Sequence, residues 1–240
     1  MELKLSPLEK KLFQGDKPDL AHGALIASGV RNRGELDAYL DMIEVLCQGI
    51  EPELPSGDYI ERAKALFDWL WESKPHRYEF RGNFRLIHVL ESQLDPGAKR
   101  VGNCLGLTLL YNVLAGRFGL STRSVYLDEA HGGESHVFSI LYIDGSTIDI
   151  DNIYPIGFDY REHLGDPLRV TWDDAGLIAD IYHSTGWALH EDDRLNDAIQ
   201  SYSKAIRLNP EYEKAYLNRG IALSMLGREE EAMRDFEQQV

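Results

Sequence analysis

The sequence predicts an α+β domain followed by an all-α array of helical repeats. Residues from about Leu8 to Leu94 repeat apolar side chains every three or four positions, which is typical of amphipathic helices. The segment SHVFSILYIDGSTIDIDN contains two β-prone runs joined at Asp144-Gly145, the strongest hairpin signal in the chain. From Asp173 onward the pattern is helical again. Helices that precede strands favour a helical half packed against a small antiparallel sheet.

The N-terminal helical part divides at a turn. Apolar periodicity is clearest in ELDAYLDMIEVLCQGI and in DYIERAKALFDWLWES, and the stretch EPELPSG between them is rich in turn-forming residues. We expect Asp58 to cap the second of these helices, with Glu61 three residues on, because a short acidic side chain accepts the first free backbone N–H groups of a helix.

A loop, a strongly apolar helix and the strands follow. The loop DPGAKRVGN leads into CLGLTLLYNVLAGRFGL, where Gly119 is the expected helix stop. The β-rich segment STRSVYL comes next, and a Gly-containing loop is expected between Glu129 and Glu134. A last short strand is expected over Leu168 to Thr171.

The C-terminal part contains an internal repeat of 34 residues. The matched positions carry a small residue on the first helix and an aromatic residue on the second, and Asn209-Pro210 falls where one repeat gives way to the next. This pattern resembles the tetratricopeptide (TPR) repeat, and the alternative is an ordinary pair of helical hairpins. The matched pairs are Gly186 with Gly220, Leu189 with Leu223, Ala198 with Ala232, and Tyr202 with Phe236.

These patterns predict two domains. The first covers residues 1–170, with a helical lobe over about residues 1–100 and the apolar helix and β-hairpin over about residues 101–170. The second covers residues 173–240 and corresponds to about 1.8 TPR repeats. Arrays of this type bind proteins or peptides in a groove, so a protein or peptide partner is expected.

The composition disfavours several classes of partner. The net charge is −15, and no cluster of Lys and Arg stands out along the sequence, which argues against nucleic acid. No apolar run reaches the length of a membrane span, and MELKLSPLEKKLFQGDKPDL lacks the apolar stretch of a signal peptide. We therefore expect a cytoplasmic protein that does not contact membranes.

The two cysteines, Cys47 and Cys104, raise the question of a nucleophile. Neither lies at zinc-ligand spacing from another Cys or His, so neither a metal nor another cofactor is expected. Cys47 lies within an amphipathic helix, where core packing is expected. Cys104 follows Gly102-Asn103 at the start of the apolar helix, and Asn103 is the expected N-cap. Because a helix N-terminus stabilises a thiolate, Cys104 is the candidate nucleophile.

The hairpin offers a base for this thiol. With Asp144-Gly145 as a two-residue turn, the register places Phe138 opposite Asp151. His136, Asp149 and Asp151 then share one face of the sheet, and Asp151 lies diagonal to His136. Asp149 sits farther along and is the alternative partner. A cysteine nucleophile needs such a base, and the base needs an orienting group.

The order of these residues resembles that of the transglutaminase-like superfamily. There, a Cys starts a buried helix, a His opens the next strand pair, and an Asp follows an I-D-G-type turn; Cys104, His136 and Asp151 match these positions. The stretch GNCLGLTLLYNVLAGRFGL resembles the short bacterial members with C-terminal TPR repeats. The resemblance implies a papain-like core and acyl-transfer chemistry by a Cys-His-Asp triad.

This sequence departs from the family pattern at two places. His136-Val137-Phe138 stands where the family usually has H-A-W, and Asn152 stands where it has proline. Many members of the subgroup also lack the Cys, which this chain keeps. The structural alternative for Cys104 is a small buried residue under the hairpin. For His136 it is a strand histidine bonded to a carbonyl group, and for Asp151 a cap of the following loop.

Two further assignments concern metal and oxyanion binding. His131, Glu134 and His136 have ligand side chains, but they lie in a Gly-rich loop without a further ligand, so no metal site is predicted. Asn103 and Asn83 are the candidate oxyanion donors, and nothing in the sequence decides between them.

Two functions from different classes follow. In the first, His136, oriented by Asp151, deprotonates Cys104, and the thiolate attacks an amide or ester carbonyl. Water or an amine then resolves the acyl-enzyme, so the enzyme is a cysteine protease, amidase or deamidase, or a transglutaminase-like acyltransferase. Hydrolysis is favoured because water needs no second pocket. In the second, the chain is a non-catalytic scaffold or adaptor that acts through its repeats.

Overall fold

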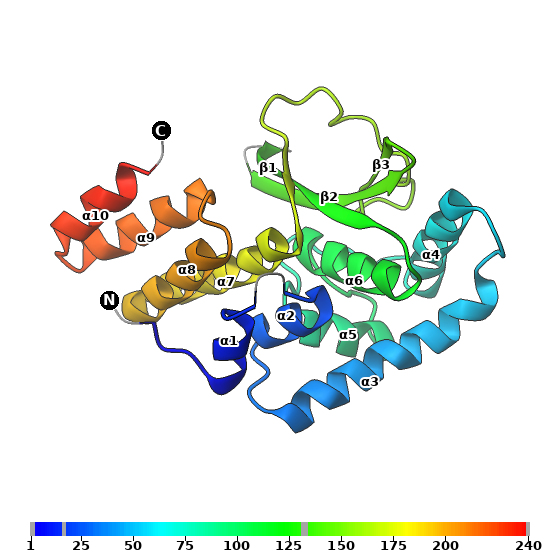
Figure 1. The fold of residues 1–240 in the computed structure, drawn as a ribbon, viewed down its shortest axis with the longest axis horizontal. Helices are drawn as coiled ribbons and strands as arrows, with labels where there is room; N and C mark the ends of the chain where they lie inside the picture. Colours follow the sequence, from blue (N-terminus) through cyan, green and yellow to red (C-terminus); the bar gives the residue numbers. More distant parts are fainter. Residues whose placement is uncertain (1–2, 16–17, 131–133, 239–240) are drawn as a thin grey trace. The chain divides into compact units, whose positions relative to one another are not determined.

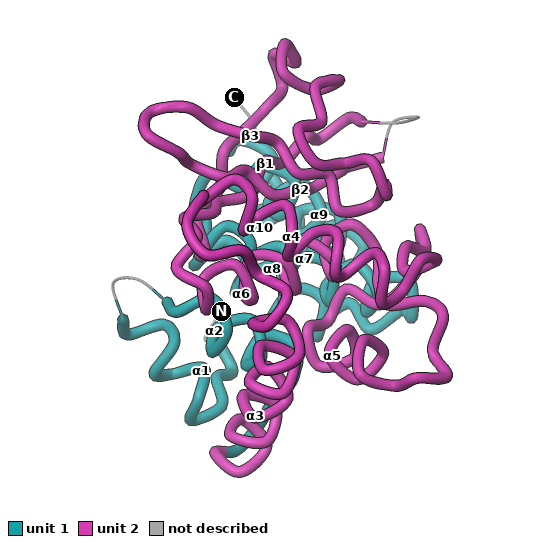
Figure 2. Tube along the Cα trace, turned by 90° about the vertical axis from the view of Figure 1, so that its right-hand side faces the viewer, with its two compact units in different colours: residues 1–32, 175–240 teal, residues 33–174 magenta. Residues whose placement is uncertain are grey.

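The structure is a computed structural model that describes residues 3–15, 18–130 and 134–238. It contains helices and a four-stranded antiparallel sheet, with a helical C-terminal part, so the α+β fold class is confirmed (Figure 1). The chain divides into two compact units, residues 33–174 and residues 1–32 together with 175–240 (Figure 2). The structure thus groups residues 1–32 with the C-terminal helices, whereas the sequence assigned them to the first domain.

The larger unit begins with helices. They are α3 (Arg33–Ile50), η1 (Glu51–Glu53), α4 (Tyr59–Ser73) and α5 (Leu86–Leu94). The three α-helices lie where apolar periodicity predicted helices, and the short 3-10 helix η1 lies in the segment predicted as a turn. Asp58 caps α4 as predicted, because its Oδ1 accepts hydrogen bonds from the backbone N–H groups of Ile60 and Glu61 at 2.7 and 3.0 Å.

The sheet has the strand order β3-β2-β1-β4. Its strands are β1 (Thr122–Ala130), β2 (Glu134–Ile143), β3 (Ser146–Ile150) and β4 (Val170–Trp172). Asp144 and Gly145 have φ angles of 44° and 84°, as the predicted two-residue turn requires. The predicted register is confirmed along the ladder as far as Ser139 opposite Ile150. Residues Glu129 and Glu134, expected in a loop, lie in β1 and β2 instead, because these strands extend farther than predicted.

Helix α6 (Cys104–Arg117) is central to the larger unit. Every residue from Leu105 to Ala115 is buried, and the helix contacts β1 and β2 as well as α3, α4 and α5 (Figure 1). A helix that is apolar on all sides is stable only inside a core, which explains why its sequence lacks a polar stripe. Gly119, with a φ of 73°, follows its end as predicted.

The smaller unit contains two helical hairpins. The first pairs α7 (Asp174–Glu191) with α8 (Leu195–Leu208), and the second pairs α9 (Glu213–Met225) with α10 (Glu229–Phe236). A Cβ atom on Gly186 would lie 2.6 Å from the ring of Tyr202, and one on Gly220 would lie 2.5 Å from the ring of Phe236. Both contacts recur at the predicted spacing, so the repeat in the sequence is a repeat of packing.

The N-terminal segment packs on the first of these hairpins. Helix α2 (Leu20–Ala27) is almost wholly buried, and Gly23 approaches Ile178 on α7. Helix α1 (Pro7–Leu12) contributes Glu9, whose carboxylate accepts hydrogen bonds from the Tyr182 hydroxyl at 3.0 Å and from Lys204 Nζ at 2.7 Å. None of the described helices has the length and apolar composition needed to cross a membrane.

Two glycines of α6 provide a matched test of its packing. A Cβ atom on Gly106 would lie 2.3 Å from the backbone oxygen of Asn83, whereas nothing lies within 4 Å of one on Gly116. We expect Gly106→Ala to lower the free energy of unfolding by about 1–3 kcal/mol, because the packed backbone must move. We expect Gly116→Ala to raise it by about 0.5–1 kcal/mol, since alanine loses less entropy in a helix. Urea unfolding followed by tryptophan fluorescence measures both, and equal effects would contradict this packing.

Candidate functional site

Cys104 is the first residue of α6 and is half-buried. The Oδ1 atom of Asn103 accepts a hydrogen bond from the backbone N–H of Gly106 at 3.0 Å, so Asn103 is the N-cap, as predicted. The N–H groups in the first turn of a helix have no carbonyl partner within the helix and carry the positive end of its dipole. The sulfur therefore lies where negative charge is stabilised.

A loop between α4 and α5 packs against this helix start. The backbone oxygen of Asn83 accepts a hydrogen bond from the Asn103 N–H at 3.0 Å, and Tyr78 forms a parallel β-bridge with Gly102. These main-chain bonds hold the residues before Cys104 in one position.

The two predicted oxyanion donors differ in the hydrogen bonds that their side chains form. Asn103 uses Oδ1 for the cap and keeps Nδ2 as a donor, whereas Asn83 Nδ2 donates to Ser92 Oγ at 3.5 Å.

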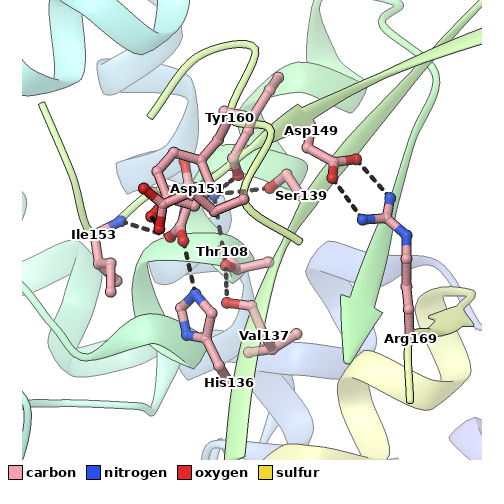
Figure 3. Close-up of polar contacts among 12 residues, drawn as sticks. Thr108, His136, Val137, Ser139, Asp149, Asp151, Ile153, Tyr160 and Arg169 are labelled. Carbon is pink, nitrogen blue, oxygen red and sulfur yellow. Dashed lines mark hydrogen bonds and ion pairs between the residues drawn. The ribbon is translucent and has the colours of Figure 1, made fainter. Parts of the chain in front are cut away.

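His136 on β2 lies between the other two candidate residues. Its Nε2 atom is 2.9 Å from Oδ2 of Asp151, and the two side chains are 5% and 0% exposed (Figure 3). The Cys104 side chain lies near enough to the imidazole to contribute to its raised pKa. Because Nε2 faces the carboxylate, Nδ1 is the nitrogen left for the sulfur. The structure thus brings together the three residues that the sequence singled out.

The surroundings of His136 favour its protonated form. Burial by itself lowers the pKa of the imidazole, but the hydrogen bonds and charges of Asp151 and Cys104 raise the pKa to about 10. This direction favours the imidazolium form of the ring, which has a carboxylate on one side. An adjacent imidazolium favours the thiolate form of a cysteine, which is the reactive form.

Asp149, the alternative partner of His136, is engaged elsewhere. Its two carboxylate oxygens accept hydrogen bonds from the terminal nitrogens of Arg169 at 2.5 and 2.6 Å (Figure 3). This bidentate pair satisfies both oxygens of the carboxylate. Asp151 is consequently the carboxylate that orients the imidazole.

A buried polar network that the sequence analysis missed connects α6 to the hairpin. Asn152 Nδ2 donates hydrogen bonds to Ser139 Oγ on β2 at 2.8 Å and to Thr108 Oγ1 on α6 at 3.5 Å (Figure 3). Thr108 in turn donates to the backbone oxygen of Val137 at 3.1 Å. The network therefore fixes the Cys104 helix against the strand of His136. The sequence does contain one indication of this network, because Thr108 is a polar residue one turn after Cys104 in an otherwise apolar helix.

The two cysteines differ in their surroundings, as predicted. Cys47 is buried within α3, and its burial together with the charge of Glu44 raises the pKa of its thiol to about 11. It is therefore protonated and packed at neutral pH. Cys104 is the more accessible of the two.

Aromatic side chains surround the candidate site. Burial, together with electrostatic contributions from Cys104, Tyr154 and Asp151, raises the pKa of Tyr78 to about 12. The ring of His163, which the sequence analysis did not single out, packs 5.5 Å from that of Phe138. The His163 ring also lies 6.0 Å from the ring of His136.

His163 also bears on metal binding. Ligand atoms of His136, Asp151 and His163 lie within 4.8 Å of one another, which is a donor set for a metal ion. A metal ion there would compete with the hydrogen bond between His136 and Asp151. In the set weighed from the sequence, His131 lies outside the described residues.

Comparisons with known proteins bear on the repeats. Residues 179–227 match the family model of the TPR repeat, so the predicted tetratricopeptide repeat is confirmed. No transglutaminase-like family model matches, and that resemblance stays a prediction. A stretch of 58 residues, 24% of this chain, is 38% identical to the uncharacterized protein MJ0572 of Methanocaldococcus jannaschii and covers 67% of it.

The fold also resembles a solved structure. It is the crystal structure of menin that reveals the binding site for the Mixed Lineage Leukemia (MLL) protein, and it matches with a TM-score of 0.52. The match covers 99% of this chain and 70% of the menin chain, with 13% sequence identity. At this identity the likeness concerns the fold alone.

The raised pKa of His136 makes stability depend on pH in a defined direction. The pKa is about 10 in the folded chain against an ordinary 6.5, so its contribution is complete below about pH 6.5 and is lost as the pH rises through 10. Between these values we expect the thermal midpoint of the wild type to fall more than that of His136→Gln, as measured by circular dichroism. His22→Gln, at an exposed histidine, should follow the wild type. Parallel curves for wild type and His136→Gln would refute the shift.

Proposed function

We propose that this chain, which carries a TPR repeat, is a thiol-dependent acyl-transfer enzyme that hydrolyses amide or peptide bonds. Cys104 is the nucleophile, His136 the acid and base, and Asp151 the orienting group. One observation carries the proposal: the imidazole of His136 lies 2.9 Å through Nε2 from a buried carboxylate and near a half-buried thiol at a helix start. This contact supplies the thiolate–imidazolium pair that the chemistry requires.

The reaction proceeds in two stages. The Cys104 thiolate attacks the substrate carbonyl, and the oxyanion that forms is stabilised by N–H groups at the start of α6, with Asn103 Nδ2 as a further donor. His136 gives its proton to the leaving amine, the C–N bond breaks, and a thioester remains. The neutral imidazole then takes a proton from water, which attacks the thioester. The acid is released, and the thiolate and imidazolium are restored.

Asp151 acts through the imidazole. Its hydrogen bond to Nε2 keeps Nδ1 directed at the sulfur and stabilises the imidazolium that exists before and after each stage. An amine in place of water would give transfer instead of hydrolysis. Water is the acceptor we favour, since it needs no second binding pocket. A cytoplasmic location, which the sequence favours, would keep the thiol reduced.

A second candidate function is a scaffold or adaptor without chemistry. The TPR repeat favours it, because such repeats commonly bind proteins. The likeness in fold to menin, whose structure reveals a binding site for the MLL protein, also favours it. In this case the repeat groove would hold a protein or peptide, and Cys104 would have no special reactivity. The two functions are compatible, because the repeats would recruit the substrate of an enzyme in the same way.

Alkylation by iodoacetamide separates the two functions. At pH 7 we expect Cys104 to react much faster than Cys47, as measured by mass spectrometry of the labelled peptides. His136→Ala should slow Cys104 by about tenfold or more, since an ordinary thiol is only a few per cent thiolate at this pH. His22→Ala, at an exposed histidine in the smaller unit, is the matched control and should leave the rate unchanged. Equal rates in wild type and His136→Ala would favour the scaffold.

An acyl-enzyme should also be trapped directly. With p-nitrophenyl acetate we expect a burst of one equivalent of p-nitrophenol per chain and an acetyl group on the peptide that contains Cys104. Cys104→Ser should abolish the burst, whereas Cys47→Ser should keep it because Cys47 is buried in the core. Acetylation confined to lysine side chains would rule out the acyl-enzyme.

A further inference from the structure

We propose that the substrate carries a carboxylate close to the bond that Cys104 attacks, so that the preferred substrate is an acidic peptide. The inference rests on the proposed function and assigns a substrate class to it. A group of positive side chains next to the start of α6 carries it. This group, the basic edge, consists of Arg77, Arg81, Arg85, Lys99 and Arg100.

The basic edge is formed by two segments that the fold joins. The chain as a whole has 40 acidic and 25 basic residues, and no cluster is evident along the sequence. In the structure, the Val101 N–H donates a hydrogen bond to the backbone oxygen of Arg77 at 2.8 Å. Arg100 Nη1 donates to the backbone oxygens of His76 and Tyr78, both at 2.9 Å. These bonds place the residues around Arg77 beside those around Arg100.

The same bonds place the basic edge at the candidate nucleophile. Arg81 and Arg85 lie two residues before and after Asn83, whose backbone oxygen bonds the residue that precedes Cys104. Arg100 lies four residues before Cys104, so their Cα atoms are at most about 14 Å apart. An extended peptide rises about 3.3 Å per residue. A carboxylate within about four residues of the reacting carbonyl is therefore in range.

These charges have no carboxylate partner within the described part of the chain. None of the five forms an ion pair there, whereas Arg169, Lys204 and Arg219 are each paired with an acidic residue. In a chain with an excess of acidic residues, a group of cations without carboxylate partners is unusual. Free guanidinium groups bind carboxylates through two parallel hydrogen bonds, which makes a carboxylate the matching ligand.

Arg77 strengthens the field of the basic edge. Its side chain is 2% exposed, and its guanidinium lies 5.9 Å from the ring centroid of Trp71. Burial lowers the pKa of Arg77 to about 9, so the group remains charged at neutral pH. A charge that is removed from water is screened less than an exposed one. Phe80, 57% exposed in the same loop, adds apolar contact area that suits a peptide more than a free anion.

Two alkylating reagents that differ by one carboxylate test the proposal on the full chain. Iodoacetate and iodoacetamide both label Cys104, and the ratio of their rates reports the local charge. At low salt we expect Arg81→Gln/Arg85→Gln to lower the iodoacetate-to-iodoacetamide ratio by about threefold, because two positive charges near the sulfur are lost. The neutral iodoacetamide reports any change in the thiol itself, and taking the ratio of the two rates removes that change from the comparison.

A charge-matched control completes this test. Arg33→Gln/Lys64→Gln removes two exposed positive charges from α3 and α4, and the ratio should stay at the wild-type value. An unchanged ratio in Arg81→Gln/Arg85→Gln, or an equal fall in both variants, would overturn the proposal. Slow labelling by both reagents in the wild type would count against the proposed enzyme, and the ratio would still report on the basic edge.

Peptides distinguish the source of the carboxylate. We would measure how far millimolar peptide protects Cys104 from iodoacetamide, using a blocked pentapeptide with a central Glu, its Gln counterpart, and the Gln peptide with a free C-terminus. We expect the Glu peptide to protect at least threefold better than the blocked Gln peptide. Better protection by the free C-terminus would place the carboxylate at a chain end. Equal protection by the two blocked peptides, or stronger protection by inorganic phosphate, would overturn the acidic-peptide assignment.

Discussion

The burial of α6 on all sides is the constraint on which the larger unit depends. Each fully buried leucine or valine contributes about 1.5–3 kcal/mol, so a helix buried from Leu105 to Ala115 cannot slide or rotate without large cost. Its first residue is thereby fixed in space. Cys104 lies at the point where this helix leaves the core. The fold therefore fixes its position, and the residue remains partly accessible to solvent. A reactive thiol needs both properties.

The buried pair of His136 and Asp151 is harder to explain by stability alone. Two charged groups that are 5% and 0% exposed lose their hydration, and the attraction between them often does no more than offset that loss. An apolar pair of similar volume would serve the core as well. The same reasoning applies less to Asp149 and Arg169, because Arg169 is partly exposed and its bidentate bonds satisfy both oxygens of the carboxylate. In the proposed function, the pair acts on Cys104, which is a role that packing does not give it.

The sequence predicts the features that depend on local geometry. The turn at Asp144-Gly145 sets the register of the hairpin, and the register brings Asp151 to His136. It does not predict contacts between distant segments. The apolar residues of α2 indicate a buried helix, but they do not indicate which element covers it. The contact of Gly23 with Ile178 was therefore missed. The network around Asn152 was missed for the same reason, since its members come from a helix, a strand and a loop.

Recognition by charge fits a protein that also carries repeats. A few guanidinium groups give weak and salt-sensitive binding, which alone would hold a peptide only briefly. When a second module holds the same partner, the local concentration of the peptide at the site rises to the millimolar range, and weak local contacts are then sufficient. The basic edge would therefore select and orient the substrate, while the TPR repeat supplies the affinity. On this view the net charge of −15 is compatible with the basic edge, because a local group of positive side chains can attract a carboxylate within an acidic chain.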